Sequence, residues 1–282
     1  MVVLNEMHLL PMPGGGNVAL HRTKPTNSNG LPVVVAHGTL SNKNAVEHLG
    51  EYLAEQGFDT WLLEWGGHGD AKSANRKQNF EYPALNDLPV AIDFIAQYTG
   101  HEQLHWTSHS GGGLLALMLL ARQPERMHQI KSLSLIGAQV TDAAPSLKEK
   151  IRVAALGTLT LLLGQTPQRL VPIGPEGEPT LLLLQWCKWN LSQRWTGADG
   201  FDYLKALEHI TVPSLVIAGG NDDVAPIKGC RRIYEALGGL KIWHECAEHH
   251  GFSKNFTHSQ MIRGAAARAE VFPLLHGFIQ RV

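Results

Sequence analysis

The chain has 282 residues, of which 44% are hydrophobic and 17% charged, so it holds enough apolar material for one large domain or one domain with an insertion. Its formal net charge is −1 and it has no long cluster of lysine and arginine, which excludes the usual electrostatic footprint of a nucleic-acid-binding protein. No apolar run reaches the roughly 18 residues that a membrane-spanning helix needs.

The first elements expected along the chain are two extended runs, residues 2–10 and 17–22, joined by a turn of one proline and three glycines at 13–16. Further apolar runs are typical of strands, at residues 33–36, 58–63, 104–107, 130–136, 212–218 and 240–245. The run at 33–36 is continuously apolar and mostly β-branched, as expected of a strand that is buried on both faces of a parallel sheet.

Helical patterns fill the intervals between these runs, at residues 42–56, 87–98, 114–121, 227–237 and 258–280. Asp87 offers an N-cap for the second of them, with Pro89 in its first turn. The last contains Gly264 and Pro273, which predict a bent or broken helix. Strands that alternate with helices at this spacing predict an α/β fold, with a mostly parallel central sheet and helices on both of its faces.

The alternation is interrupted at residues 141–208, where strand signals are few. This segment contains an apolar helical stretch, a loop rich in proline and glycine, and a second apolar run, at residues 151–163, 165–179 and 181–184. We interpret it as a small, mainly helical cap that is inserted after the strand at 130–136. The core is then formed by residues 1–140 and 209–282. The leucines of the cap are expected to pack against the core and can also line a site for an acyl chain.

A serine in a sharp turn follows the strand at 104–107. Ser110 is followed by three glycines and then by the apolar helical run at 114–121, so strand, turn and helix form the setting of a nucleophile elbow. Small residues two before and two after the serine let the strand and the helix pack closely at the bend. The usual pattern is G-x-S-x-G. Here Ser108 stands in the place of the first glycine, and Gly112 in that of the second.

A serine hydroxyl needs a base to accept its proton and a third group to orient that base. In a hydrolase of this topology the acid and the histidine follow the serine on loops after later strands. Asp222 and Asp223 come just after the run at 212–218, and we favour Asp222 as the acid. His249 and His250 follow the run at 240–245, and we favour His249 as the base.

The developing negative charge on the substrate requires an oxyanion hole made of two backbone N–H groups. One is expected from Gly111, the residue after the nucleophile, and the other from the loop after the run at 33–36. In that loop, Thr39 is our candidate donor, because Gly38 lets the backbone approach closely. His37 is expected to brace the loop by hydrogen bonding and not to act in catalysis.

The sequence resembles the α/β-hydrolases, and within them the acid (gastric and lysosomal) lipase branch. The stretches that carry the resemblance are residues 36–38, 52–62, 87–95 and 104–112, and more weakly 219–222 and 249–252. The resemblance implies Ser110 as nucleophile, Asp222 as acid, His249 as base, and backbone oxyanion donors at Thr39 and Gly111. The family has glycine where this chain has Ser108, and often glutamine in place of Gly111. The cap is also shorter than the lid of the family's lipases, so a carboxylesterase for shorter acyl chains is expected at least as much as a lipase.

We therefore expect a serine hydrolase that cleaves carboxylic esters through an acyl-enzyme on Ser110. The same triad could serve a thioesterase, an acyltransferase or a peptidase, because fold and triad do not separate these activities. A non-catalytic binding protein with a hydrolase fold is the alternative of a different class, and the cap could also dock on lipid.

The expected partner of the chain is a small-molecule acyl ester, with no nucleic acid, no cofactor and no metal ion. Four histidines cluster in the C-terminal part without a metal-ligand pattern such as H-E-x-x-H, at positions 244, 249, 250 and 258. Three widely spaced cysteines without a C-x-x-C motif are typical of reduced, buried thiols. The first residues have no basic segment followed by a long apolar one, so no secretory signal is visible and a cytoplasmic location is the expectation.

Overall fold

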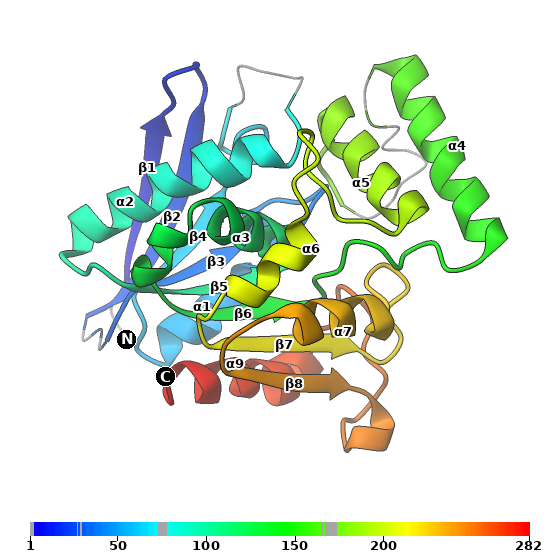
Figure 1. Cartoon of the computed structure of the whole chain (residues 1–282). Helices are drawn as coiled ribbons and strands as arrows, with labels where there is room; N and C mark the ends of the chain where they lie inside the picture. The colour runs from blue at the N-terminus through cyan, green and yellow to red at the C-terminus, as the bar shows by residue number, and fades with distance from the viewer. Residues whose placement is uncertain (1–2, 27, 29, 73–77, 165, 167–173) are drawn as a thin grey trace.

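The computed structural model describes the chain except for residues 1–2, 27, 29, 73–77, 165 and 167–173, which are grey in Figure 1. The runs expected at 2–10 and 165–179 fall partly on these residues, and that part of each prediction lies outside the described structure. Within the described part, a sheet of eight strands has the order β1-β2-β4-β3-β5-β6-β7-β8. The strands are β1 (Val3–Pro11), β2 (Asn17–Pro25), β3 (Val33–Ala36), β4 (Thr60–Glu64), β5 (Leu104–His109), β6 (Ile130–Ile136), β7 (Ser214–Gly219) and β8 (Lys241–Cys246).

The sheet is antiparallel only at its N-terminal edge. The hairpin of β1 and β2 pairs antiparallel to β4, and from β4 to β8 every neighbouring pair is parallel. The expected α/β fold with a mostly parallel sheet is therefore confirmed. Because the carboxyl ends of parallel strands lie at one edge of a sheet, the loops after β3, β5, β7 and β8 can build a common site there.

The helices cover both faces of the sheet (Figure 1). They are α1 (Glu47–Glu55), α2 (Leu88–Thr99), α3 (Gly111–Arg122), α4 (Leu147–Leu163), α5 (Thr180–Ser192), α6 (Tyr203–Ala206), α7 (Ile227–Ala236), α8 (Gly264–Ala266) and α9 (Phe272–Ile279). Buried residues of α2, α3 and α7 share one hydrophobic cluster, and those of α1 and α9 share a second. Along β3, Val34 and Ala36 belong to the first cluster, whereas Val33 and Val35 belong to the second. Both faces of this strand are thus covered, which explains its continuously apolar sequence.

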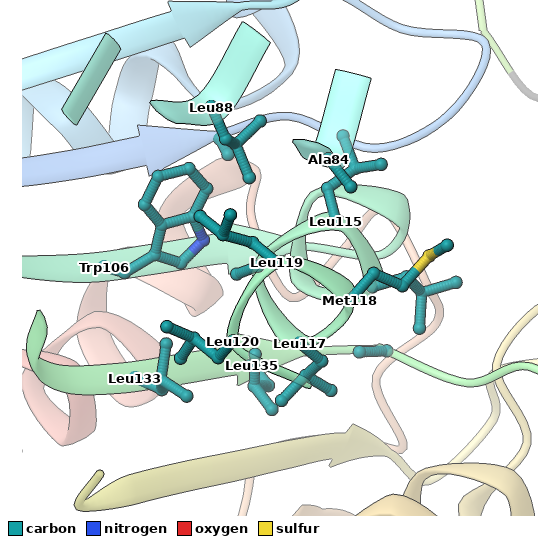
Figure 2. Close-up of a cluster of buried hydrophobic side chains, with 14 of the residues drawn as sticks. Ala84, Leu88, Trp106, Leu115, Leu117, Met118, Leu119, Leu120, Leu133 and Leu135 are labelled. Atoms are coloured by element: carbon teal, nitrogen blue, oxygen red, sulfur yellow. The ribbon is translucent and has the colours of Figure 1, made fainter. Parts of the chain in front are cut away.

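The helix α3 follows the turn that holds Ser110 and lies in the middle of the core. All of its residues from Gly111 to Leu120 are buried. Figure 2 shows leucines of α3 packed among side chains of the neighbouring elements, which include Trp106 of β5, Leu133 of β6 and Leu88 of α2. A helix that is apolar all round must be packed on all sides, so α3 is a rigid base for the turn that precedes it.

Two expected helix boundaries are wrong. Asp87 does not cap α2, because a π-helical turn at Pro83–Asp87 continues directly into the helix and the Asp87 carboxylate accepts the N–H of Gly66 at 2.9 Å. The last helical segment begins only at Gly264, and its middle is a π-helical turn, Ala267–Val271. Residue 258, the expected start of that helix, therefore lies in the loop before it.

The segment 141–208, here termed the insertion, lies between β6 and β7 and contains α4, α5 and α6. Figure 1 shows α4 and α5 beyond the carboxyl edge of the sheet, with α4 outermost. A small hydrophobic cluster of its own joins these two helices, through Val153, Leu183 and Cys187. No described helix is long and apolar enough to cross a membrane. The three cysteines are buried free thiols.

Candidate active site

The turn between β5 and α3 has the strained backbone of a nucleophile elbow. Ser110 has φ 51° and ψ −120°, a conformation that residues with a Cβ rarely adopt. Its N–H donates to the carbonyl of Ile136 on β6 at 2.8 Å, and its carbonyl accepts from Gly113 at 3.0 Å. A Cβ added to Gly38 in the neighbouring loop would lie 2.9 Å from the Ser110 Cβ, so that loop can pass only with glycine at this point.

Ser108 occupies the place of the usual glycine without preventing the elbow. Its side chain is buried and its hydroxyl donates to the carbonyl of Ser134 on β6 at 3.1 Å. A Cβ on Gly113 would lie 3.2 Å from the Ser108 Oγ, which shows that the hydroxyl fills space between the strand and α3. The substitution therefore adds a buried hydrogen bond at the end of β5 and leaves the turn in its strained form.

The acid predicted after β7 pairs with His258 and not with the predicted His249. Asp222 is buried, and its Oδ2 lies 2.7 Å from Nδ1 of His258. The other carboxylate oxygen accepts the N–H groups of Val224 and Ala225, at 2.9 and 2.7 Å. With the carboxylate ionised, Nδ1–H donates and Nε2 is left unprotonated, the tautomer that a general base requires. The neighbouring Asp223 is exposed.

The prediction that His249 lies beside this acid is wrong, and so is its alternative, His250. Both are exposed in the short turn Glu248–His250, and His249 Nε2 lies 3.1 Å from a carboxylate oxygen of Glu245. The loop after β8 first leaves the sheet and then returns. The N–H of Phe256 donates to the carbonyl of Cys246, and the carbonyl of Phe256 accepts from Asn221. This return places residue 258 beside Asp222.

A sequence signal for His258 does exist. His258 lies in the same connection after the last strand as His249, but the apolar spacing of residues 258–280 predicts that His258 belongs to a helix. The preference for the histidine nearest to the strand end is the error, because a long loop can bring back a later residue.

His258 also contacts the elbow. Its backbone carbonyl accepts from Nε2 of His109, the residue just before Ser110, at 3.1 Å, and the two imidazole rings are 4.3 Å apart. Burial lowers the pKa of His109 well below its usual value, so this ring is a neutral hydrogen-bonding group. A Cβ on Gly137 would lie 3.1 Å from the His258 ring, and Gly137 lines the same cavity as Ser110.

The two predicted oxyanion donors contact each other. A Cβ placed on Gly111 would lie 3.0 Å from the N atom of Thr39 and 2.7 Å from its Cγ2. The loop that carries Thr39 is braced by His37, whose Nδ1 lies 2.7 Å from the carbonyl of Gly38 and whose ring stacks on Trp65 at 3.8 Å. Burial lowers the pKa of His37 to about 3, so the ring is neutral and Nδ1–H can donate.

A small cavity of about 60 Å³ adjoins Ser110, Thr39 and Gly111. It is therefore narrow. Its walls are mainly apolar and come from the core and the insertion: Leu40, Phe80, Leu114, Leu156, Leu182, Leu183, Trp186, Val224 and Ala225. Two of the polar side chains in the wall are Gln139 and Glu178. Such a site suits a slender apolar group beside a reacting carbonyl.

Two groups of described side chains are close enough to share a metal ion, and neither lines this cavity. They are Glu245 with His249 and His250, and His21 with Glu64 and Asp70. In the second group the buried Glu64 already accepts backbone N–H groups of Lys43 and Asp70. These contacts account for the carboxylate without an ion.

Known proteins resemble part of this chain in sequence and nearly all of it in fold. Residues 32–169 match the family described as alpha/beta hydrolase fold. Human lysosomal acid lipase/cholesteryl ester hydrolase is 30% identical over 122 residues, which are 38% of this chain and 31% of that protein. Human gastric triacylglycerol lipase is 28% identical over 155 residues, which are 49% and 39%. The matches thus span well under two thirds of these relatives. A solved esterase from Exiguobacterium antarcticum has a TM-score of 0.68 at 18% identity, covering 96% of this chain and 98% of its own, and shows the common fold.

Proposed function

Because the chain has the α/β-hydrolase fold, we propose that it is a serine hydrolase that cleaves carboxylic ester bonds through an acyl-enzyme on Ser110. The observation that carries the proposal is the Asp222–His258 pair, 2.7 Å apart, in contact with the turn of a strained serine. Its partial relatives include lipases, which act on esters. His258 replaces His249 in the triad that we propose.

In the proposed reaction Ser110 attacks the ester carbonyl while Nε2 of His258 takes the hydroxyl proton. The same proton passes to the leaving alcohol, and a water molecule activated by His258 then releases the acid. Asp222 holds the imidazole in the required tautomer; because its second oxygen is bound by two backbone N–H groups, the carboxylate cannot turn away. The N–H groups of Thr39 and Gly111 would stabilise the oxyanion, and removal of one such donor lowers kcat by about 10²–10³-fold.

The substrate that the cavity favours is an ester with a short or slender apolar acyl group. The insertion supplies part of the wall through Leu156, Leu182 and Trp186, and we propose that residues 141–208 act as a cap on the core. Hydrolysis by an interfacial lipase is a second candidate, favoured by the exposed leucine and isoleucine side chains of α4 at positions 147, 151, 161 and 162. The two candidates differ in one observation. A rate that rises sharply when the substrate passes from monomers to an emulsion indicates a lipase, and a smooth rise indicates an esterase.

The proposal is tested with p-nitrophenyl esters of increasing acyl length and a fluorophosphonate probe. The native chain should hydrolyse short esters and bind the probe covalently, and Ser110→Ala should do neither. His258→Ala should lose activity by about 10³-fold or more, while His249→Ala serves as a matched control and should stay near the native rate. Activity that survives Ser110→Ala would refute the proposed nucleophile. Activity lost in His249→Ala but kept in His258→Ala would refute the proposed base.

A further inference from the structure

A carboxylate from the insertion reaches the loop that carries Thr39. The side chain of Glu178 is fully buried in the wall of the cavity beside Ser110. Its Oε1 accepts the backbone N–H of Leu40, the residue after Thr39, and lies 3.1 Å from Nε2 of the buried His68. The hydrogen bond between Glu178 and Leu40 joins positions that are 138 residues apart in the sequence.

Leu40 needs an external partner, because its backbone is strained. It has φ 60°, in the left-handed region that favours glycine, and its side chain is buried. Its carbonyl accepts from the N–H of Glu176, 3.1 Å away. Gly174 passes so close that a Cβ there would lie 1.8 Å from the same carbonyl oxygen. Both backbone polar groups of Leu40 are thus bound by the insertion, which has no space to move closer.

Glu178 is itself held in place from two sides. Its backbone N–H and C=O both bond to the hydroxyl of Thr166, at 3.0 and 2.7 Å. Burial acts to lower the pKa of His68, but the charge and hydrogen bond of Glu178, together with the charge of Glu176, raise it overall, so the buried pair favours a proton on the imidazole. The His68 ring in turn packs against His37, 5.2 Å away, which braces the same loop. Such a supported carboxylate can define the position of a backbone N–H.

We propose that Glu178 is a positioning residue for the oxyanion hole. By binding the N–H of Leu40 it holds that residue in the left-handed conformation and so keeps the N–H of Thr39 directed at the reacting carbonyl; the inference rests on the esterase function proposed above. Docking of the insertion and assembly of the oxyanion hole are then one event. Without the carboxylate acceptor the strained turn relaxes, and the oxyanion loses a donor.

The test compares Glu178→Met, which keeps the volume but removes the acceptor, with Glu178→Gln, which keeps an oxygen for the N–H of Leu40. We expect Glu178→Met to lower kcat by about 10²-fold, as for loss of one oxyanion donor, with KM within about threefold. Glu178→Gln should recover most of kcat. A boronic acid that mimics the tetrahedral intermediate should lose affinity for Glu178→Met in proportion to kcat.

Glu176→Met is the matched control from the same segment. Its carboxylate binds Asn42 and the N–H of Gly69, but not Leu40, so its removal loosens the docking without unbinding the Leu40 N–H. If Glu176→Met and Glu178→Met lower kcat equally, or if kcat of Glu178→Met is unchanged, the inference is overturned. If Glu178→Met does not fold, Thr166→Val replaces it, and an unchanged kcat in that variant overturns the inference. A native chain without esterase activity would instead refute the proposed function.

Discussion

Replacing Gly112 by alanine should damage both the fold and the elbow, because the two are in contact at this residue. The added Cβ would lie 2.5 Å from the carbonyl oxygen of His37 and 2.9 and 3.0 Å from Cβ and O of Ala36. Two of these atoms belong to the backbone of β3 and its following loop, so no side-chain rotation can relieve the contact. Overpacking of this kind costs about 1–3 kcal/mol. The helix α3 must move away from the loop that carries Thr39, and a shift of about 1 Å in a catalytic group can lower the rate by about 10²-fold.

Urea unfolding and p-nitrophenyl ester hydrolysis measure the two effects on the same preparation. Gly277→Ala is the control, because Gly277 lies in α9 and a methyl group added there would have no atom within 4 Å. That variant should gain about 0.5–1 kcal/mol of stability from helix propensity, with native activity. A Gly112→Ala protein with native stability and native kcat would show that β3 and α3 are not in close contact at the elbow.

Two further predictions concern buried polar side chains of β5. Ser108→Ala should lower the free energy of unfolding by about 1 kcal/mol, through loss of the bond to the Ser134 carbonyl, and leave kcat nearly unchanged; a large loss of kcat would assign Ser108 a role in the turn. Burial lowers the pKa of His105 to about 4, whereas the unfolded side chain titrates near 6.5. Below about pH 6.5 the unfolded state binds the proton first. The contribution of His105 is therefore complete above that pH and is lost as the pH falls towards 4. Urea midpoints across this range should show a weaker decline for His105→Gln, and identical declines would contradict the assigned burial.

The parts of the fold that sequence reasoning predicts are those determined by neighbouring residues. The strand β3 is recognisable because burial of both its faces removes polar residues from it. Ser110 is recognisable because a sharp turn between a strand and a helix needs small residues close to the serine in the sequence. In both cases the pattern that reveals the feature lies in its own residues or directly beside them.

The features that sequence reasoning misses depend on how a long connection folds back. The position of residue 258 follows from two backbone hydrogen bonds of Phe256 to residues before and after the loop, and neither leaves a pattern in the sequence. The contact of Glu178 with Leu40 is of the same kind, since no local propensity predicts which buried carboxylate meets a distant N–H group. A sequence can present a set of histidines in the correct order without indicating which of them returns to the acid.

Strained backbone conformations occur where these long-range contacts meet the proposed active site. Among the described residues, three other than glycine have positive φ, and two of them, Leu40 and Ser110, adjoin the cavity. Each such residue costs about 1–3 kcal/mol and persists only where its surroundings hold it. The surroundings differ: the N–H of Ser110 is bound by β6 of the core, whereas that of Leu40 is bound by the insertion. The serine is thus held by a strand in the middle of the sheet. If the proposals above hold, the loop that carries Thr39 depends on a segment outside the core, and we expect mild destabilisation to lower kcat before it lowers labelling of Ser110 by a fluorophosphonate probe.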